Sequence, residues 1–475
     1  MSEQFIKVIG WLLAHGMLFF IMLVLSAQNM VYFMQLICCI IERVKTPDSV
    51  VTKRDMWALQ GMQTPGVSII APAYNEELTI SQSVRSLLSN DYPTLEVIII
   101  NDGSKDRTLD ILKVDFQLIP SRRQQLWHLD HQPVLGTYES QSHPNLFVVD
   151  KANGRKADAA NAGICYAQYP LISVTDADSL LESDALLRAT APFLSDDGSL
   201  VAVGCSIRLT NGCRIAGGSL LEARLPKTFI ERFQTIEYLR AFMVARIASS
   251  SWHLLMLISG GFGVFKRDAV LAAGGYCHDS LGEDLEMVVR LHRKSWEAGK
   301  PARVAYVPES ICWTEVPSTY AGLRNQRTRW QQGALGTLRD HRVMLFNRRY
   351  GRIGLAGMPM IFLEDVLVPV AEVVGYALIP IFLWLNMTSG LWLIGMLFMS
   401  FLLGTALSIG ALFQEEYQQR SIKRSREVAI LIFCAFVENF GYRQFNTYCR
   451  LRGVQKFFAK ETSWAAVPRV GFVNN

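Results

Sequence analysis

The strongest constraint on the fold of this chain is an almost continuous apolar run from Ile9 to Ile41. A bilayer core about 30 Å thick requires about 20 helical residues, so the run is long enough for one membrane span. Gln28 and Asn29 are its main interruption, and a second span beyond them would have only residues 30–41, which is too short. The run has no small-residue cleavage site and is longer than the apolar part of a signal peptide. We therefore predict an uncleaved membrane anchor over residues 1–45.

Charge and cysteine content narrow the expected compartment and partners. Arg43, Lys45, Lys53 and Arg54 follow the apolar run, and such basic flanks mark the cytoplasmic side of a span. The chain has a net charge of only +5 and no basic run with interleaved aromatic residues. We therefore expect a lipid bilayer as a partner and no nucleic acid. Nine scattered cysteines without a CxxC pair indicate structural thiols in a reducing compartment.

Between residues 67 and 313, short apolar runs alternate with helical patterns and polar turns. This alternation is typical of an α/β fold with a mostly parallel sheet and crossover helices. Ligands bind such sheets beyond the carboxyl ends of the strands, so the residues after each run are candidate site residues. Residues 115–144, rich in polar side chains, are predicted to form a surface insertion. The predicted strands are Val67–Ala71, Val97–Ile100, Leu146–Val149, Leu171–Val174 and Leu200–Val203.

Apolar character returns in the last third of the chain. Residues 341–360 mix arginines with apolar side chains, which predicts a helix lying in the membrane interface. Ile361–Leu385 and Leu391–Phe413 are each long enough to span a bilayer, and the basic loop at 420–426 that follows them indicates the cytoplasmic side. Val428–Phe440 is a third apolar stretch, which crosses the membrane, re-enters it or lies flat.

The stretch "NQRTRWQQG" (residues 325–333) stands just before this second apolar region. On a helix, Gln326, Arg329 and Trp330 share one face because their spacing is i, i+3 and i+4. The simplest interpretation is a surface helix with an incidental Trp. The alternative is a face that presents these three side chains to a ligand.

Three polar stretches follow predicted strands. The first, "APAYNEE" (residues 71–77), is either a turn with helix-capping residues or part of a binding site. In "NDGSKDRT" (101–108), Asp102 either contacts a nucleotide base or ribose or belongs to a capped turn. In "DKANGRKADAANAG" (150–163), Arg155 and Lys156 stand at a helix start, where two cations and free backbone N–H groups suit a pyrophosphate. A solvated basic turn is the alternative for this third stretch.

Two further stretches place carboxylates at element ends. Asp176 and Asp178 follow the strand Leu171–Val174, and residues i and i+2 of an extended chain point the same way. Two converging carboxylates suit Mg²⁺ or Mn²⁺ bound jointly with substrate phosphates, although a turn with a helix cap is the alternative. Glu283 and Asp284 open a predicted helix, where they act either as a general base for a hydroxyl nucleophile or simply as partners of the helix dipole.

Taken in chain order, these motifs resemble those of the membrane-embedded family 2 glycosyltransferases. This processive group contains bacterial cellulose, hyaluronan and poly-N-acetylglucosamine synthases. The resemblance covers nearly everything from residue 67 to the tail. The matching stretches are "SIIAPAYNEE", "VIIINDGSKDRT", "NGRKADAANAG", "VTDADS", "QTIEY", "SGGFGVFKR", "GED", "CWTEVPST", "QRTRWQQG", "ENFGYRQF" and "SWAAVPRVGF".

The resemblance implies a GT-A type nucleotide-sugar-binding domain between an N-terminal and several C-terminal transmembrane helices. It implies a bacterial inner-membrane protein of several spans whose catalytic domain is cytoplasmic. The expected units are the anchor (1–45), the cytoplasmic glycosyltransferase domain (46–340), the interfacial helix (341–360), the transmembrane region (361–445) and a basic tail on the cytoplasmic side (446–475).

The resemblance also implies roles for the donor-site residues. Asp102 would contact uridine, and Lys156 would meet phosphate or the base region. Asp176 and Asp178 would hold Mg²⁺ or Mn²⁺ on the diphosphate. The other residues implied at the donor are Ala73, Tyr74, Glu76, Gly260 and Gly261.

For the reaction itself, the resemblance implies that Asp284 is the catalytic aspartate, with Glu283 beside it. Gln326, Arg329 and Trp330 would line the acceptor and the diphosphate. One departure concerns Gly282, which stands where relatives frequently have Thr, and another is Asn101, where many have a second Asp.

The implied activity is inverting, processive transfer of a sugar from a UDP-sugar to a growing β-linked exopolysaccharide, coupled to its passage across the membrane. N-acetylglucosamine and glucose are the expected sugars. Accessory membrane or periplasmic export subunits are possible partners. One alternative is transfer of a single sugar to a lipid or short acceptor, and another is an inactive membrane receptor or scaffold.

Overall fold

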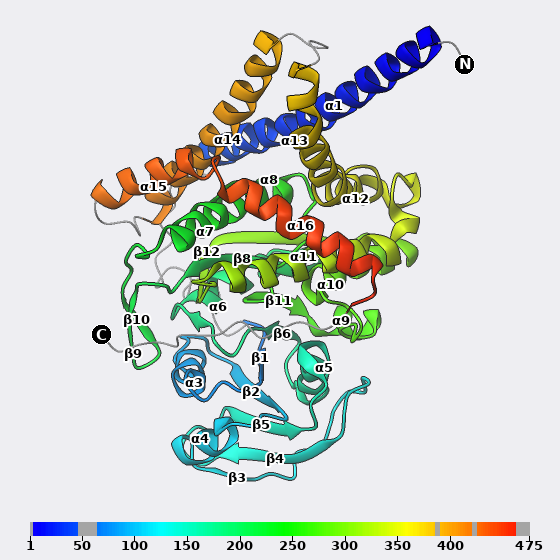
Figure 1. Cartoon of the computed structure of the whole chain (residues 1–475). Coiled ribbons are helices and arrows are strands. Elements are labelled where there is room, and N and C mark those ends of the chain that lie inside the picture. The colour runs from blue at the N-terminus through cyan, green and yellow to red at the C-terminus, as the bar shows by residue number, and fades with distance from the viewer. Residues whose placement is uncertain (1–2, 46–63, 385–389, 420–424, 462–475) are drawn as a thin grey trace.

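The computed structural model describes residues 3–45, 64–384, 390–419 and 425–461. Lys53 and Arg54, the basic positions 420–424, and the tail motif "SWAAVPRVGF" lie outside these residues. Within them, an α/β domain carries a group of long apolar helices on one side (Figure 1). These helices include α1 (Glu3–Lys45), α13 (Val368–Trp384) and α14 (Gly390–Gln419).

A ten-stranded sheet forms the centre of the domain in the described part of the chain, in the order β3-β4-β5-β2-β1-β6-β11-β8-β12-β7. Each of the five predicted strands is confirmed and lies within an observed strand. The strands are β1 (Val67–Ala73), β2 (Leu95–Asp102), β3 (Leu118–Pro120), β4 (Val134–Ser140), β5 (Leu146–Lys151), β6 (Leu171–Val174), β7 (Leu180–Leu181), β8 (Leu200–Leu209), β11 (Gly263–Lys266) and β12 (Arg303–Thr314). A separate hairpin pairs β9 (Arg214–Ala216) with β10 (Ser219–Glu222).

We predict a mostly parallel sheet, whereas the observed sheet is mixed, with a parallel centre and antiparallel pairs on both sides of it. Strands β5, β2, β1 and β6 run parallel to one another. They are almost entirely buried apolar runs, as expected for parallel strands covered on both faces. Strand β11 is antiparallel to both β6 and β8. The predicted insertion at 115–144 supplies β3 and β4, which extend the sheet antiparallel to β5.

Strand register brings the ends of the parallel strands to one edge of the sheet. Ala73 at the end of β1 pairs with Asn101 of β2, and Asp102 pairs with Lys151 at the end of β5. Helix α5 (Arg155–Tyr166) packs on β1 and β2 directly after this edge. The edge is therefore where side chains from several strands can meet a ligand.

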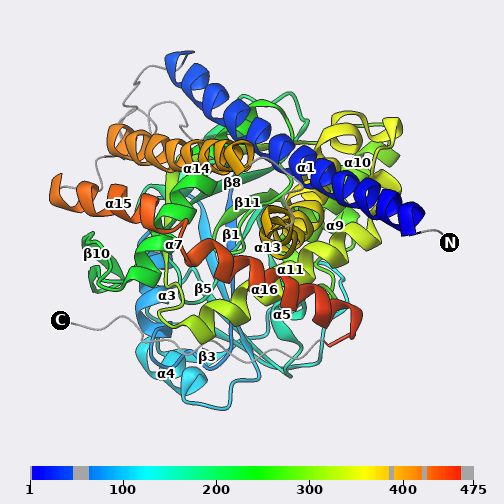
Figure 2. The same cartoon turned by 45° about the horizontal axis from the view of Figure 1, so that its top comes forward.

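The remaining helices surround the sheet or connect it to the apolar group. Helix α10 begins next to the carboxyl edge, and α11 packs on both α10 and α16. Figure 2 shows α11 and α16 running side by side. The helices are α3 (Ile80–Leu88), α4 (Thr108–Asp115), α6 (Ala185–Leu194), α7 (Phe229–Arg240), α8 (Arg246–Ser251), α9 (Arg267–Ala273), α10 (Glu283–Glu297), α11 (Tyr320–Asp340), α12 (Met358–Phe362), α15 (Ser425–Val437) and α16 (Tyr442–Phe458).

Three described helices are long and apolar enough to cross a membrane: His15–Lys45, Ile353–Ile381 and Phe398–Glu416. The first belongs to the single unbroken helix α1, which packs against α13 and α14. The predicted apolar stretch Val428–Phe440 lies in α15 and in the turn that follows it, where the chain bends by 59° into α16.

Residues 341–360, for which we predict one interfacial helix, differ from that expectation. They begin with two short 3-10 turns at Arg342–Met344 and Arg348–Tyr350. Gly351 then adopts φ 52°, a left-handed conformation that interrupts a regular helix. Beyond it the chain is helical through α13, with π-helical turns at Ile353–Gly357 and Leu363–Leu367.

Ion pairs and hydrogen bonds connect the α/β domain to the apolar helices. Arg208 of β8 forms an ion pair of 2.6 Å with Glu415 of α14, and both side chains are almost fully buried. Arg450 of α16 lies 2.5 Å from Asp365 and donates to Gln331 of α11 at 3.1 Å. Buried charge pairs of this kind are costly to break, because the remaining charge is left without compensation. The position of α11 is thus tied to the helices that it precedes.

Candidate active site

Asp102 organises the loop that leads into α5. Its carboxylate accepts N–H bonds from Gly154 and Arg155, both at 2.9 Å, and a bond of 2.7 Å from the ammonium of Lys151. Arg155 is held at φ 73°, a left-handed conformation uncommon for residues other than glycine. Asp102 therefore shapes the start of α5 from the neighbouring strand, a role that neither sequence interpretation included. Its predicted contact with uridine stays a prediction.

Lys151 is the buried counter-ion of this arrangement. Its side chain has no solvent exposure and forms ion pairs with both Asp102 and Asp158. Asp158 also accepts the backbone N–H of Gln132 and lies 3.3 Å from His278. Little in the sequence indicated that Lys151 is a buried counter-ion, because its two partners, Asp102 and Asp158, are far apart in the sequence.

Lys156, the second residue of α5, extends into a group of carboxylates. Its Nζ lies 2.6 Å from Asp176 and 3.6 Å from Glu283, and it donates to the carbonyl of Gly260 at 3.4 Å. Burial lowers the pKa of Lys156, but the nearby carboxylates of Asp176 and Glu283 raise it more, so the net pKa lies above its ordinary value. The ammonium is therefore positively charged throughout the physiological range. The structure thus brings the Lys156 ammonium close to Asp176 after β6, to Gly260 before β11 and to Glu283 at the start of α10.

Asp284 lies at the same point, at the start of α10. Its Oδ2 accepts the N–H of Gly260 at 3.1 Å, and its Oδ1 accepts the N–H of Leu285 at 2.9 Å. A Cβ on Gly260 would lie 2.7 Å from Nζ of Lys156, so a side chain there would push into the site. The carbonyl of Gly261 instead accepts a bond of 2.5 Å from Thr175. Gly260 thus borders the site, while Gly261 is fixed to the end of β6.

Asp176 and Asp178 follow β6 but do not continue it. The strand ends at Val174, and Ser179 N–H closes a turn on the carbonyl of Asp176 at 3.0 Å. The alternation expected of an extended chain therefore does not apply, because the backbone turns before Asp178. Asp176 is about one-third exposed beside Lys156, and Asp178 is buried.

The described residues contain no group of three His, Cys, Asp or Glu side chains placed to hold a metal ion. A divalent cation at Asp176 and Asp178 would need further oxygen ligands from a bound substrate. Two hard carboxylates completed by phosphate oxygens match how Mg²⁺ is commonly held. The donor set therefore fits a cation that arrives with a diphosphate.

The residues at the end of β1 form a wall of the same edge. Ala73 is buried, and the next residue, Tyr74, is 45% exposed. Asn75, at φ 56°, accepts the N–H of Lys105 at 2.8 Å, which joins the loops after β1 and β2. The carboxylate of Glu76 accepts the hydroxyl of Thr79 at 2.8 Å. Asn75 and Glu76 thus have partners within this loop, whereas the N-cap of the following helix is Thr79, and Tyr74 is exposed.

Helix α11 touches the start of α10 through two glycines. A Cβ on Gly333 would lie 2.7 Å from Cα of Gly282, and one on Gly282 would lie 3.0 Å from Cα of Gly333. Gly333 continues the stripe of Gln326, Arg329 and Trp330, because it stands at i+7. This face of α11 therefore contacts Gly282, the residue directly before Glu283. This contact also explains why Gly282 departs from Thr, for which there is no room.

We expect Gly333→Ala to lower the rate of any reaction that uses Asp284 by up to about 10²-fold, because it would displace the start of α10 and with it Asp284. Gly336→Ala is the matched control, since a Cβ at Gly336 meets nothing within 4 Å on the same helix. The turnover of each purified variant, compared at saturating substrate, measures the effect. Equal rates for the two variants would contradict the role assigned to the glycine contact.

Trp330 is held by a network that sequence reasoning missed. The guanidinium of Arg327 lies 4.2 Å over the Trp330 ring and donates to Glu237 of α7 at 2.9 Å. Tyr442 of α16 donates to the same carboxylate at 2.8 Å. Trp330 itself is 41% exposed. Glu237 and Arg327 stand within the motifs "QTIEY" and "QRTRW", but nothing in the sequence showed that they pair.

A comparison with protein families identifies the class of protein to which this fold belongs. Residues 65–333 match the model described as "Glycosyltransferase like family 2", and the chain belongs to this family. The fold is also that of a mannosyltransferase from Pyrobaculum calidifontis in complex with GDP-Man and Mn²⁺. That structure aligns with a TM-score of 0.55 and 17% identity over 93% of this chain and 99% of its own.

Among individual relatives, the chain is similar to poly-beta-1,6-N-acetyl-D-glucosamine synthases. It is 31% identical over 271 residues to the enzyme of Staphylococcus epidermidis and 29% identical over 269 residues to that of Staphylococcus aureus. These alignments cover 57% and 56% of this chain. The matched region spans 55% and 54% of the respective relatives, a little over half of their length.

Proposed function

We propose that this protein is an inverting glycosyltransferase that polymerises N-acetylglucosamine from UDP-N-acetylglucosamine into a β-linked exopolysaccharide. The observation that carries the proposal is the cluster of Lys156, Asp176, Glu283 and Asp284 around Gly260. The choice of sugar is supported by the two relatives named as poly-beta-1,6-N-acetyl-D-glucosamine synthases.

Asp284 acts as the general base in this proposal. It takes the proton of the acceptor hydroxyl as that oxygen attacks the anomeric carbon on the face opposite UDP. The bond between the anomeric carbon and the UDP oxygen breaks in the same displacement, so an α-linked donor yields a β-linkage. The N–H of Gly260, 3.1 Å from Asp284, fixes the carboxylate for this task. No covalent sugar intermediate is required.

Lys156 stabilises the leaving diphosphate. Its charge lies at the start of α5, where backbone N–H groups also favour an anion. Preorganised positive charge at the position where negative charge develops is usually the largest single contribution to catalysis. In the absence of donor, Asp176 and Glu283 hold this ammonium in place.

Asp176 and Asp178 would hold a Mg²⁺ or Mn²⁺ ion together with the phosphate oxygens of the donor. When bound, such an ion supplies Lewis-acid stabilisation of the diphosphate. The side chains of Tyr74 and Asp102 would border the uridine, and Gln326 and Arg329 the diphosphate and acceptor.

The location follows from the same proposal. The basic positions after residue 41 support a location of the domain on the cytoplasmic face of a bacterial inner membrane. The three candidate spans would then place the N-terminus on the opposite face and return the chain to the cytoplasmic face before α15. A donor on the cytoplasmic side and a polymer on the other require a route between the apolar helices.

A donor screen tests the proposal. The purified full-length protein is incubated with UDP-N-acetylglucosamine, UDP-glucose or GDP-mannose, each with Mg²⁺, with Mn²⁺ or with chelator. We expect polymer only from UDP-N-acetylglucosamine and only with a divalent cation. Polymer from another donor would overturn the choice of sugar, and full activity in chelator would overturn the metal assignment.

Trp330→Ala is expected to shorten the polymer. An aromatic face packs against the C–H surface of a sugar. If removal of the ring costs about 1.4 kcal/mol of binding free energy, the affinity for the acceptor falls about tenfold. Glu237 continues to hold Arg327 in the variant. Gel filtration of radiolabelled product measures the length, with Trp330→Phe as the aromatic control. Products of wild-type length from Trp330→Ala would show that this ring does not contact the acceptor.

A further inference from the structure

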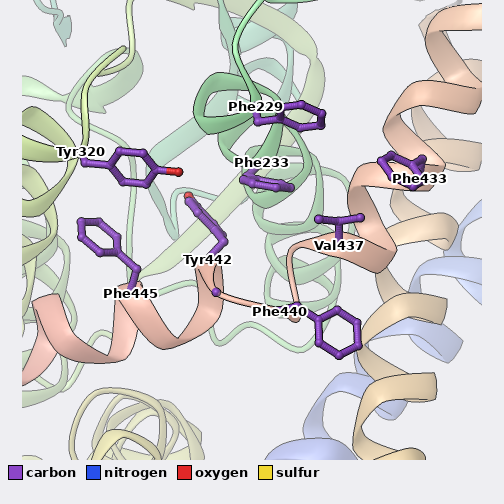
Figure 3. Close-up of a pocket in the computed structure, with 9 residues that line it drawn as sticks. Phe229, Phe233, Tyr320, Phe433, Val437, Phe440, Tyr442 and Phe445 are labelled. Atoms are coloured by element: carbon purple, nitrogen blue, oxygen red, sulfur yellow. The ribbon is translucent and has the colours of Figure 1, made fainter.

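A pocket lined by aromatic rings lies where α7 meets the bend between α15 and α16 (Figure 3). Its volume is about 500 Å³. Phe229 and Phe233 come from α7, Phe433 from α15, Phe440 from the bend, and Tyr442 from α16. We call this the aromatic pocket. None of the residues assigned above to the donor, the metal or the general base lines it.

The chemistry of the aromatic pocket selects an apolar ligand. Phe440 is 74% exposed, Phe433 57% and Phe229 51%, so large rings open outward around it. The lining side chains with hydrogen-bonding atoms are Tyr320 and Tyr442, and the hydroxyl of Tyr442 already donates to Glu237. A sugar would bury several hydroxyls here with few partners, which is costly. An apolar chain would have no such cost.

The aromatic pocket is continuous with the apolar helices. The Phe440 ring lies 5.9 Å from that of Phe401 in the candidate span Phe398–Glu416, and the Phe436 ring of α15 lies 6.0 Å from the same ring. The 13 residues of α15 extend about 20 Å, too short to cross a bilayer core of about 30 Å. The chain instead bends by 59° into α16, which packs on α11. The aromatic pocket therefore lies where the apolar helix α14 meets α7 and α15.

We propose that the aromatic pocket binds an acyl chain of a bilayer phospholipid and thereby braces the helix that carries Trp330. One wall of the pocket is Tyr442, whose hydroxyl donates to Glu237 at 2.8 Å. Glu237 accepts from Arg327, which lies over the Trp330 ring. An acyl chain packed against the Tyr442 ring would hold Tyr442, Glu237 and Arg327 in these contacts. The effect on the acceptor rests on the proposed function, whereas lipid binding does not.

Photo-cross-linking tests the binding. The full-length protein is reconstituted in vesicles of phosphatidylethanolamine and phosphatidylglycerol that contain a small fraction of phospholipid with a diazirine at the end of one acyl chain. Mass spectrometry then locates the cross-links. We expect them to concentrate at residues 433–445 and to fall several-fold when Val437→Trp fills the aromatic pocket. Phe458→Trp, at the exposed far end of α16, is the control and leaves the yield unchanged.

Phe440→Ser provides a second variant, because this exposed ring can be removed without opening the core. It should also lower the cross-link yield. Cross-links spread evenly over α14 and α15, or a yield unchanged by both pocket variants, would overturn the acyl-chain site. Protection of residues 433–445 by added polysaccharide or by a co-purifying membrane protein would overturn it in favour of that other occupant.

Tyr442→Phe tests the connection to Trp330. This variant keeps the ring in the aromatic pocket but removes the hydrogen bond to Glu237. We expect an unchanged cross-link yield, an unchanged donor KM and a polymer several-fold shorter than wild type. Wild-type polymer length would overturn the bracing role and leave the lipid site intact. Absence of any transferase activity in the wild type would defeat the proposed function without altering the cross-linking result.

Discussion

Purified protein carrying Asp284→Asn transfers sugar about 10²- to 10⁴-fold more slowly than the wild type, if Asp284 is the general base. Asparagine has the same shape and can still accept the N–H of Gly260, but it cannot take a proton at neutral pH. Donor binding should persist, because Lys156 and Asp176 remain paired in the variant. The rate of UDP release at saturating donor, together with the affinity for UDP, separates the two effects.

Asp279→Asn is the matched control, since Asp279 is exposed and lies five residues before Asp284. We expect its turnover to equal that of the wild type. A turnover of Asp284→Asn within a few-fold of the wild type would remove Asp284 from the mechanism. A loss of UDP affinity in place of turnover would instead make it a donor-binding residue.

Replacing Lys151 by Met should have the largest effect on stability. Lys151 is the buried cation between Asp102 and Asp158, and its loss leaves two carboxylates in the interior without their counter-ion. Breaking such a buried arrangement costs about 3–5 kcal/mol in the free energy of unfolding, which lowers the melting temperature by roughly 10 °C. Thermal unfolding of the detergent-solubilised protein measures the shift.

Lys300→Met serves as the control for this prediction, because Lys300 is exposed on the loop after α10. It should melt as the wild type does. The same melting temperature for Lys151→Met would show that the two carboxylates are compensated in another way, and the loop before α5 would then not depend on Lys151.

The sequence was sufficient for the central sheet because buried parallel strands read as continuous apolar runs. Val67–Ala71 and Leu171–Val174 were predictable for this reason, and both lie in the observed sheet. The direction of β11 and the edge strands β3 and β4 were not, since a short strand carries no record of which neighbour it pairs with. The turn after Val174 was also missed, because the apolar pattern ends there and does not show which way the backbone continues.

The candidate site was partly predictable from where strands end. Lys156, Asp176, Glu283 and Asp284 were each singled out by position, and the structure brings them together. The ion pairs beside Asp102 and Trp330 were not visible, because Lys151 with Asp102 and Arg327 with Glu237 join segments that are distant in the sequence. In the sequence, Gly282 was a departure from the motif. The structure shows that its close contact with Gly333 leaves no room for a side chain.

The most direct test of the central claim is the structure of the polymer made in a defined reaction. Purified full-length protein, UDP-N-acetylglucosamine and a divalent cation are incubated, and the product is sized and examined by NMR. We predict a chain of many N-acetylglucosamine units whose anomeric protons are all β, and no such product from Asp284→Asn. An α-linked chain, or a single sugar attached to lipid, would contradict the account.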